Sequence, residues 1–293
     1  MSSQPTSHYF PALACVVAAV LWGLFWYPLR LLEQMGIPGL WASLIIYSFA
    51  VIFVIPVCFK KRTEFLKFKV EYLLMGLFAG WTNLAFILAV LEGEIVRVLV
   101  LFYLSPIWAI LLAVLILHER LTRVGLCSLI LAIVGAGLML WRPELSYSNG
   151  IGLVEFYAIT SGMAFAVTNI VVRKIGSTPI VVKMGASWLG VIVLTLIALL
   201  FEQLPVPEIT AHSGFLVLLI GFPAMYVMTW AAQYGVTHLP IQRSSVIFLL
   251  EIVAGAVSAA LWTDEVVSNI EYVGGVLIIS AGLISIIKEK TTI

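Results

Sequence analysis

Ten long apolar stretches make up most of this chain, and few charged side chains interrupt them. A helix needs about 20 apolar residues to cross a bilayer, and each stretch has roughly that length. The stretches are 11–32, 38–59, 70–91, 95–117, 122–141, 151–172, 180–201, 213–236, 240–263 and 270–287. Little chain remains outside them. The sequence therefore predicts an all-α polytopic membrane protein with ten transmembrane helices.

Composition supports this class and limits where a function can reside. Of the 293 residues, 62% are hydrophobic and only 11% are charged, whereas soluble domains carry about 25% charged residues. No soluble catalytic domain fits in the remaining chain, so any function must be built inside the helix bundle. The lipid bilayer is an expected partner, and nucleic acid is not.

The basic residues predict the orientation of the chain. If the N-terminus is cytoplasmic, thirteen of them fall on the cytoplasmic side, namely Lys60, Lys61, Arg62, Lys67, Lys69, Arg120, Arg123, Arg173, Lys174, Lys183, Arg243, Lys288 and Lys290. The opposite side carries only Arg30, Arg97 and Arg142. Basic residues are enriched in cytoplasmic loops. We therefore expect a multi-pass protein of the inner (plasma) membrane with both termini in the cytoplasm.

The second half of the chain weakly repeats the first, at an offset that drifts from 141 to about 147 residues. At this offset Ser105 falls on Glu251. Because each half contains five predicted spans, the two halves cross the membrane in opposite senses. We therefore expect two inverted five-helix repeats, residues 1–148 and 149–293. Inverted repeats are typical of transporters that work by alternating access, although a duplication without alternating access is the alternative.

Glu251 lies alone in an apolar run from about Pro240 to Thr263. A carboxylate at that depth costs roughly 2.5–3.5 kcal/mol on insertion scales, so it needs a partner, a proton or a water-filled cavity. We interpret Glu251 as a residue that faces the path of a transported solute. A protonated carboxyl bonded to a neighbouring helix is the alternative.

Aromatic and polar side chains near the predicted mid-depth are further candidates for substrate binding. Together with Glu251, the predicted site contains Trp22, Asn83, Phe86, Tyr226, Trp230 and Phe248. Aromatic belts belong at the membrane interfaces, so rings at mid-depth favour a cavity; packing or lipid contact is the alternative for each ring. An interhelical hydrogen bond is the alternative for Asn83. Pro106 and Pro223 are expected to kink their helices and are candidate hinges.

The residue types near mid-depth also narrow the substrate. No Lys or Arg is expected there, which argues against phosphorylated solutes, because phosphate recognition generally needs cations. One carboxylate among aromatic faces suits apolar, zwitterionic or cationic solutes. The chain contains no His-Glu-x-x-His pair, Gly-x-Ser-x-Gly elbow or Walker loop, so no catalytic residue, metal or cofactor is expected. A membrane-embedded enzyme acting on a lipid or isoprenoid, and a channel, are the alternative functions.

Two sets of residues resemble a known family. Leu104-Ser105-Pro106, then His118-Glu119-Arg120-Leu121-Thr122, then a small-residue helix with Ser128 and Gly135, resembles the first EamA repeat of the drug/metabolite transporter superfamily. The second copy reads Leu250-Glu251-Ile252, then Asp264-Glu265, then Gly275 and Gly282, with Ile252 where the family usually has proline. The resemblance covers nearly the whole chain. It implies a ten-helix carrier similar to bacterial exporters of aromatic and other neutral amino acids.

The sequence thus predicts a secondary transporter rather than an enzyme. It would export neutral and aromatic amino acids, and related metabolites or cationic drugs, by alternating access. Small residues on the fifth and tenth spans either pack a dimer or join the two halves; they are Ser128, Ala132, Ala136, Gly275 and Gly282. A monomer is preferred.

Overall fold

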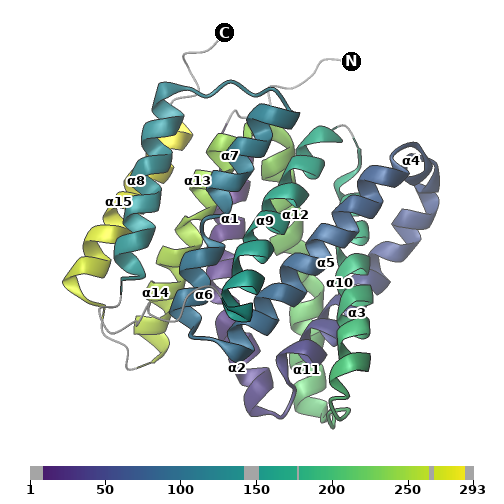
Figure 1. The fold of residues 1–293 in the computed structure, drawn as a ribbon. Helices are drawn as coiled ribbons and strands as arrows, with labels where there is room; N and C mark the ends of the chain where they lie inside the picture. Colours follow the sequence, from purple (N-terminus) through teal and green to yellow (C-terminus); the bar gives the residue numbers. More distant parts are fainter. Residues whose placement is uncertain (1–8, 142–151, 177, 264–266, 288–293) are drawn as a thin grey trace.

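The computed structural model describes residues 9–141, 152–176, 178–263 and 267–287, and every regular element among them is helical (Figure 1). The predicted orientation residues Arg142, Lys288 and Lys290, and the acidic pair Asp264-Glu265, lie outside the described residues.

The helices follow one another in two groups. The first half of the chain forms α1 (Phe10–Leu24), α2 (Trp26–Gln34), α3 (Gly39–Lys60), α4 (Arg62–Lys67), α5 (Lys69–Glu92), α6 (Ile95–Phe102), α7 (Ser105–Ile116) and α8 (Arg123–Met139). The second half forms α9 (Leu153–Lys174), α10 (Ile180–Glu202), α11 (Ala211–Leu219), the π-helical segment η1 (Ile220–Ala224), α12 (Met225–His238), α13 (Ile241–Phe248), α14 (Leu250–Trp262) and α15 (Asn269–Ile287).

These helices confirm the predicted fold class. Among the described residues, nine segments are long and apolar enough to cross a membrane, and some of them consist of two or more consecutive helices joined end to end. The shorter apolar helix α8, with 17 residues, lies at the lower limit for a span. It provides the remaining crossing of the ten that were predicted. The predicted spans agree with these helices to within a few residues at most ends.

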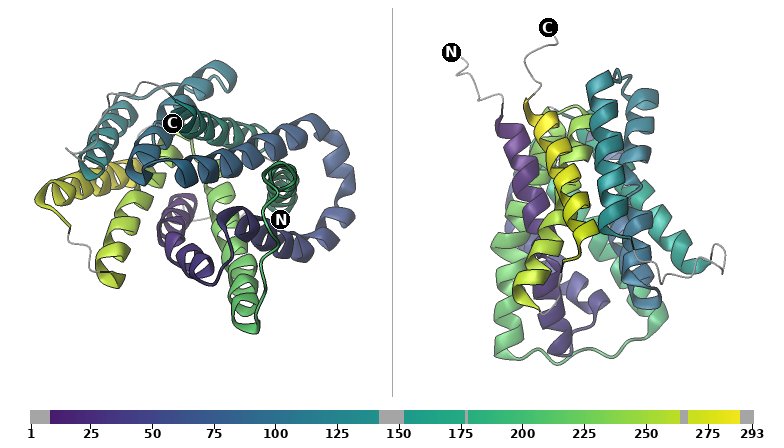
Figure 2. Two further views of the ribbon diagram at one scale, coloured as in Figure 1. Left: turned by 60° about the horizontal axis from the view of Figure 1, so that its bottom comes forward. Right: turned by 90° about the vertical axis from the view of Figure 1, so that its left-hand side faces the viewer.

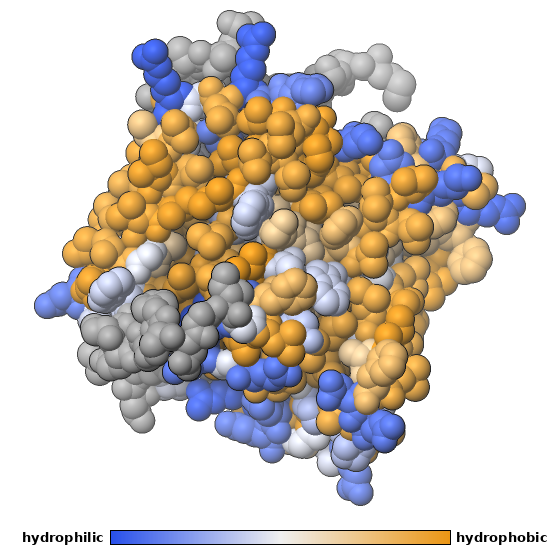
Figure 3. Space-filling model, in the orientation of Figure 1, coloured by the Kyte–Doolittle hydropathy of each residue, from blue (hydrophilic) through white to orange (hydrophobic). Residues whose placement is uncertain are grey.

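The surface has the pattern that a bilayer requires. Figure 3 shows apolar side chains covering the middle of the visible face, with polar side chains gathered at its two ends. We name these ends after the partly buried ion pair at each of them. The Glu119 end contains the α7–α8 connection, the end of α9 and the start of α13, and the Glu155 end contains the start of α9. The start of α1 and the end of α15 also lie at the Glu119 end (Figure 2).

Lys183 departs from the expectation for a charged loop residue. The described basic residues that were predicted on the cytoplasmic side flank helix ends at the Glu119 end, and most of them are exposed. Lys183, in the first turn of α10, is instead fully buried. Its Nζ donates to Val172 O and to Thr237 Oγ1, both at 3.0 Å. Sequence position alone placed this lysine at the right end but could not show that neighbouring helices cover it.

Two membrane crossings are interrupted part-way along their length in the same way. Between α6 and α7, Leu104 N donates to Leu101 O and Ile107 N donates to Leu104 O, at 3.3 and 2.9 Å. Between α13 and α14 the same two bonds recur around Leu249, which donates to Val246 O and accepts from Ile252 N at 3.2 and 3.1 Å. These bonds span three residues rather than four, so each break is a tightened helical turn.

Small residues allow helices of the two halves to approach closely. A Cβ on Gly190 of α10 would collide with the backbone of Gly76 on α5. A Cβ on Gly135 of α8 would lie 2.6 Å from Gly274 O of α15. Figures 1 and 2 show these two helices side by side. The small residues of the fifth and tenth crossings therefore join the two halves within one chain.

Candidate functional site

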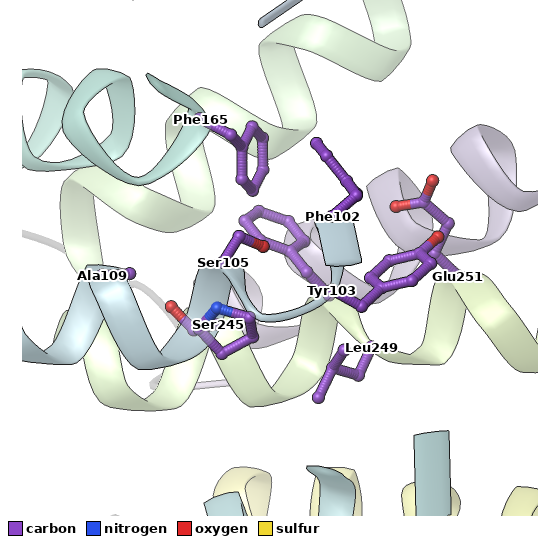
Figure 4. A pocket seen from close by; sticks show the side chains of 10 residues that line it. Phe102, Tyr103, Ser105, Ala109, Phe165, Ser245, Leu249 and Glu251 are labelled. Atoms are coloured by element: carbon purple, nitrogen blue, oxygen red, sulfur yellow. The ribbon is translucent and has the colours of Figure 1, made fainter. Parts of the chain in front are cut away.

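A small cavity lies where the two helix breaks meet, and each half of the chain supplies five of its lining residues (Figure 4). The first half contributes Phe102, Tyr103, Ser105, Pro106 and Ala109 from α6, α7 and the turn between them. The second half contributes Phe165 from α9, and Ser245, Phe248, Leu249 and Glu251 from α13, α14 and their turn. The lining therefore combines aromatic rings with hydroxyl groups and one carboxyl group.

Glu251 and Tyr103 form the polar part of this cavity. Glu251 is in the first turn of α14, and Tyr103 is in the turn that ends α6. Their side chains point toward each other in Figure 4. The predicted carboxyl of the cavity thus faces a hydroxyl-bearing ring from the other half of the chain. Sequence reasoning missed Tyr103; its place three residues before the candidate hinge Pro106 is the signal that could have identified it.

A glycine on a facing helix holds each break in place. An added Cβ on Gly23 of α1 would lie 2.5 Å from Glu251 O, and one on Gly162 of α9 would lie 2.7 Å from Phe102 O. In both cases the obstructing atom is a backbone carbonyl oxygen, which cannot rotate away as a side chain can. Glycine is therefore required where the first helix of one half packs on the broken helix of the other.

Four phenylalanine rings form a continuous row across the bundle. Phe86 of α5 packs edge-on against Phe102, with ring centroids 5.1 Å apart. Phe102 contacts Phe165 at 5.8 Å, and Phe165 contacts Phe248 at 6.2 Å. Such pairs are favourable in tilted and edge-to-face arrangements. Two residues of the predicted site, Phe86 and Phe248, therefore lie at the two ends of one aromatic row that passes through the cavity.

The predicted tryptophans lie on the far side of Phe248. Trp22 of α1 and Trp230 of α12 pack, together with Phe248, against the buried alanines Ala18 and Ala231. Tyr226 lies one turn before Trp230, and both pack on the core that surrounds α3. Trp22 and Trp230 thus extend the aromatic surface beyond the cavity, whereas Tyr226 faces a neighbouring core.

The other predicted site residues have separate surroundings. Asn83 Oδ1 accepts a hydrogen bond from Ser43 Oγ of α3 at 3.0 Å, so this amide joins two helices. Pro106 is in the first turn of α7 and lines the cavity. Pro223 is in η1, directly after Phe222, whose backbone is extended (φ −157°, ψ 121°). Both candidate hinge prolines therefore lie at interruptions of a crossing helix.

The cavity between the two breaks is small. Its volume is about 20 Å³, which is enough for about one water molecule. An amino acid or a larger solute does not fit between the two breaks as they stand. The two breaks therefore leave a space between them that is smaller than such a solute.

Solved structures with the same overall fold are known. Among solved structures, 28 chains match. One of them, a crystal structure described only as that of a protein, has a TM-score of 0.75 and 15% sequence identity, and the match covers 94% of this chain and 96% of that chain. At this identity the likeness shows a shared fold. No curated protein matches the sequence.

A family model gives the classification. Residues 10–141, from the start of α1 to just beyond α8, match the EamA-like transporter family. This match confirms the resemblance that was identified from the Leu104-Ser105-Pro106 and His118–Thr122 segments. The first half of the chain, residues 10–141, is thus similar to the EamA-like transporter family, and this similarity indicates a multi-pass membrane transporter of small solutes.

Proposed function

We propose that this protein is a secondary transporter that exports neutral and aromatic amino acids by alternating access. Related metabolites and aromatic cations form the wider substrate class. The observation that carries this proposal is the cavity, where a carboxyl group and aromatic rings lie between two broken helices from different halves of the chain. Discontinuous helices commonly form the substrate sites of transporters.

The chemistry of the cavity supports this substrate class. An ammonium group can pair with the Glu251 carboxylate, and the aromatic faces of Phe102, Phe165 and Phe248 can contact an apolar side chain. Cation–π contact adds about 0.5–2 kcal/mol for a cation over a ring. The cavity lining contains no basic residue, so a phosphorylated solute has no counter-charge there.

The two breaks also support the proposed inverted repeats, residues 1–148 and 149–293. Each break contains the same pair of shortened hydrogen bonds, and each packs on a glycine from the opposite half. We infer that these packed surfaces, with Pro106 and Pro223 at helix interruptions, permit one half to move against the other. The basic residues at the Glu119 end support a cytoplasmic location for that end in the plasma membrane.

Counterflow into proteoliposomes tests the function. Labelled phenylalanine, threonine or methionine is added outside vesicles that contain the same unlabelled solute. We expect saturable accumulation that other neutral amino acids reduce by competition. Folded protein that gives no accumulation above empty liposomes would overturn the amino-acid assignment. Flux without saturation would favour a channel, and a chemically altered lipid or isoprenoid without solute flux would favour a membrane-embedded enzyme.

The same assay tests the site. Glu251→Gln removes the carboxylate but keeps the shape of the side chain, so we expect a changed pH profile and weaker uptake of zwitterions and cations. Glu202→Gln is the matched control, because Glu202 is exposed at the end of α10. Normal uptake with a normal pH profile in Glu251→Gln would remove Glu251 from both substrate binding and proton binding.

A further inference from the structure

A loop from the first half of the chain contacts the second half at the Glu119 end. Glu119 lies in the connection between α7 and α8, and its Oε1 accepts from Arg173 Nε at 3.1 Å. Its Oε2 accepts from the backbone N–H of Ile241 at 2.9 Å. These two donors belong to the last turn of α9 and the first turn of α13. One carboxylate therefore holds together the ends of two helices that are remote in sequence.

The contacts continue beyond Arg173 to a third and a fourth helix. Arg173 Nη1 donates to Thr237 O of α12 at 2.6 Å. The hydroxyl of the same threonine accepts from Lys183 Nζ of α10 at 3.0 Å. The network of Glu119, Arg173, Thr237, Lys183 and the Ile241 amide thus connects the loop to α9, α10, α12 and α13. We call this set the latch.

The charges of the latch make Glu119 its critical member. Arg173 and Lys183 both bond to Thr237, so two cations lie close together. Lys183 is fully buried, and in the part of the chain that the structure describes no carboxylate pairs with it. Glu119 supplies the negative charge of this group. If its carboxylate leaves, the Ile241 amide loses its acceptor and the two cations repel each other without compensation.

Local backbone structure directs Glu119 into this position. His118 adopts a left-handed conformation (φ 54°), which reverses the chain directly before Glu119. Three residues later, the backbone N–H and the hydroxyl of Thr122 both contact Gln242 Oε1 at 3.4 Å. The loop is therefore fixed on both sides of Glu119, and its second attachment is also on α13.

The latch holds two of the helices that line the cavity, α9 and α13. Phe165 precedes Arg173 by eight residues on α9, and Ser245 follows Ile241 by four residues on α13. At 1.5 Å per residue, these separations are roughly 12 and 6 Å along the helix axes. Separation of the ends of α9 and α13 would therefore loosen the buried apolar packing, including Ala113, Ile170 and Ile241, next to the cavity.

We propose that Glu119 is the closing element of the gate at this end of the carrier. While its carboxylate bridges Arg173 and the Ile241 amide, the cavity is closed toward this side. When it withdraws with its loop, Arg173 and Lys183 remain on the second half and line the opened entrance. This inference rests on the proposed alternating access, because it assigns the contact that one of the two access states must break.

Site-specific labelling tests the latch without requiring a known substrate. Cys15, Cys58 and Cys127 are replaced by alanine, and Ser245→Cys places one reporter thiol in the cavity. A membrane-impermeant maleimide is then added to inside-out vesicles, which expose the cytoplasmic end. We expect Glu119→Gln to raise the labelling rate about ten-fold, a change within the usual range of coupling between conformational states.

A variant at the opposite end is the matched control. Glu155 also makes an ion pair with an arginine, Arg97, whose Nη2 lies at 2.8 Å, but at the far end of α9. Glu155→Gln should therefore leave labelling from the cytoplasmic side unchanged. If Glu119→Gln does not fold, Arg173→Lys keeps the positive charge but loses the planar group that contacts both Glu119 and Thr237. This variant should also raise the labelling rate.

The outcomes separate the two proposals. An unchanged rate in a folded Glu119→Gln or Arg173→Lys protein would overturn the latch, whatever the solute assay gives. An equal rise in Glu155→Gln would also overturn it, because the effect would then be general loosening. Absence of counterflow in the parent protein, with labelling that still responds to Glu119→Gln, would sink the proposed substrates and leave the latch standing.

Discussion

Glu119 and Glu155 form nearly the same pair of bonds at opposite ends of α9. Each carboxylate gives one oxygen to an arginine and the other to a backbone N–H at a helix start. The partners of Glu119 are Arg173 and the Ile241 amide, on two separate helices. Glu155 bonds to Arg97 of α6, but its second donor is Gly152 N at 2.7 Å, the cap of its own helix.

The difference between the two ends is therefore one of topology rather than chemistry. If α9 moved away from α6, Glu155 would keep its capping bond and lose only its contact with Arg97. If α9 and α13 separated from the loop, Glu119 would lose both of its bonds. The comparison teaches that similar local energies can have different consequences for motion, depending on how many separate elements the bonds join.

The largest expected effect comes from overpacking the contact between the middle of α9 and the break at the end of α6. Gly162→Val places a branched side chain where even a Cβ would lie 2.7 Å from Phe102 O. Overpacking of this kind costs about 1–3 kcal/mol, and we expect about 3 because the obstacle is backbone. Thermal and denaturant unfolding in detergent measure the loss. Met163→Val on the exposed neighbouring position is the control, and equal stability of the two variants would contradict the close contact.

Loss of the Glu119 carboxylate should have the next largest effect on stability. Glu119→Gln leaves Arg173 without its carboxylate and removes the negative charge of the latch. Breaking a buried ion pair costs about 3–5 kcal/mol, and because Glu119 and Arg173 are partly accessible we expect about 2. Unfolding midpoints in detergent provide the measurement. A loss below about 0.5 kcal/mol would mean that water or lipid headgroups replace the carboxylate.

The equivalent change at the other end should cost less. In Glu155→Gln the amide oxygen can still accept from Gly152 N, and Arg97 retains a further interaction. We expect a loss of about 1 kcal/mol, near the value for a single capping or surface charge interaction. The same unfolding experiment measures it beside Glu119→Gln. If Glu155→Gln proves the more damaging of the two, the difference between the ends is the reverse of our interpretation.

The smallest expected effect concerns a second contact at the Glu155 end. Trp26 Nε1 of α2 donates to Ser258 Oγ of α14 at 3.0 Å. Trp26→Phe removes this bond but keeps an aromatic ring, and interhelical bonds in membranes average about 0.6 kcal/mol. Tyr27→Phe is a suitable control next in sequence. A loss of 2 kcal/mol or more would show that this end depends on Trp26 and not mainly on Glu155.

The helix breaks illustrate what local sequence can and cannot predict. Pro106 cannot donate a backbone hydrogen bond, so the interruption between α6 and α7 was predictable. Ile252 occupies the corresponding place in the second half, yet the chain makes the same tightened turn at Leu249. Close to that turn, the backbone of Glu251 packs against Gly23 of α1. A break without proline therefore depends on which helix lies beside it, and local sequence does not contain that information.

The candidate site was predictable in part for the same reason. Glu251 and Phe248 stand out in the sequence because a carboxylate and a ring near mid-depth require an explanation, and both line the cavity. Tyr103 and Ser245 are unremarkable in sequence and became site residues only when the two breaks came together. Asn83 shows the converse, since a polar side chain at mid-depth bonds to Ser43 on a neighbouring helix.

The sequence by itself determined the fold class, the approximate ends of the crossings and the collection of basic residues at one end. The length of an apolar segment and the position of basic residues determine how a chain crosses a bilayer. Both can be taken from the sequence without knowing which helices pack together. Only the tertiary structure decided that Lys183 is buried, that Glu119 bridges α9 and α13, and that the cavity has a volume of about 20 Å³. These features depend on contacts between residues far apart in the chain, and such contacts exist only after the helices have packed.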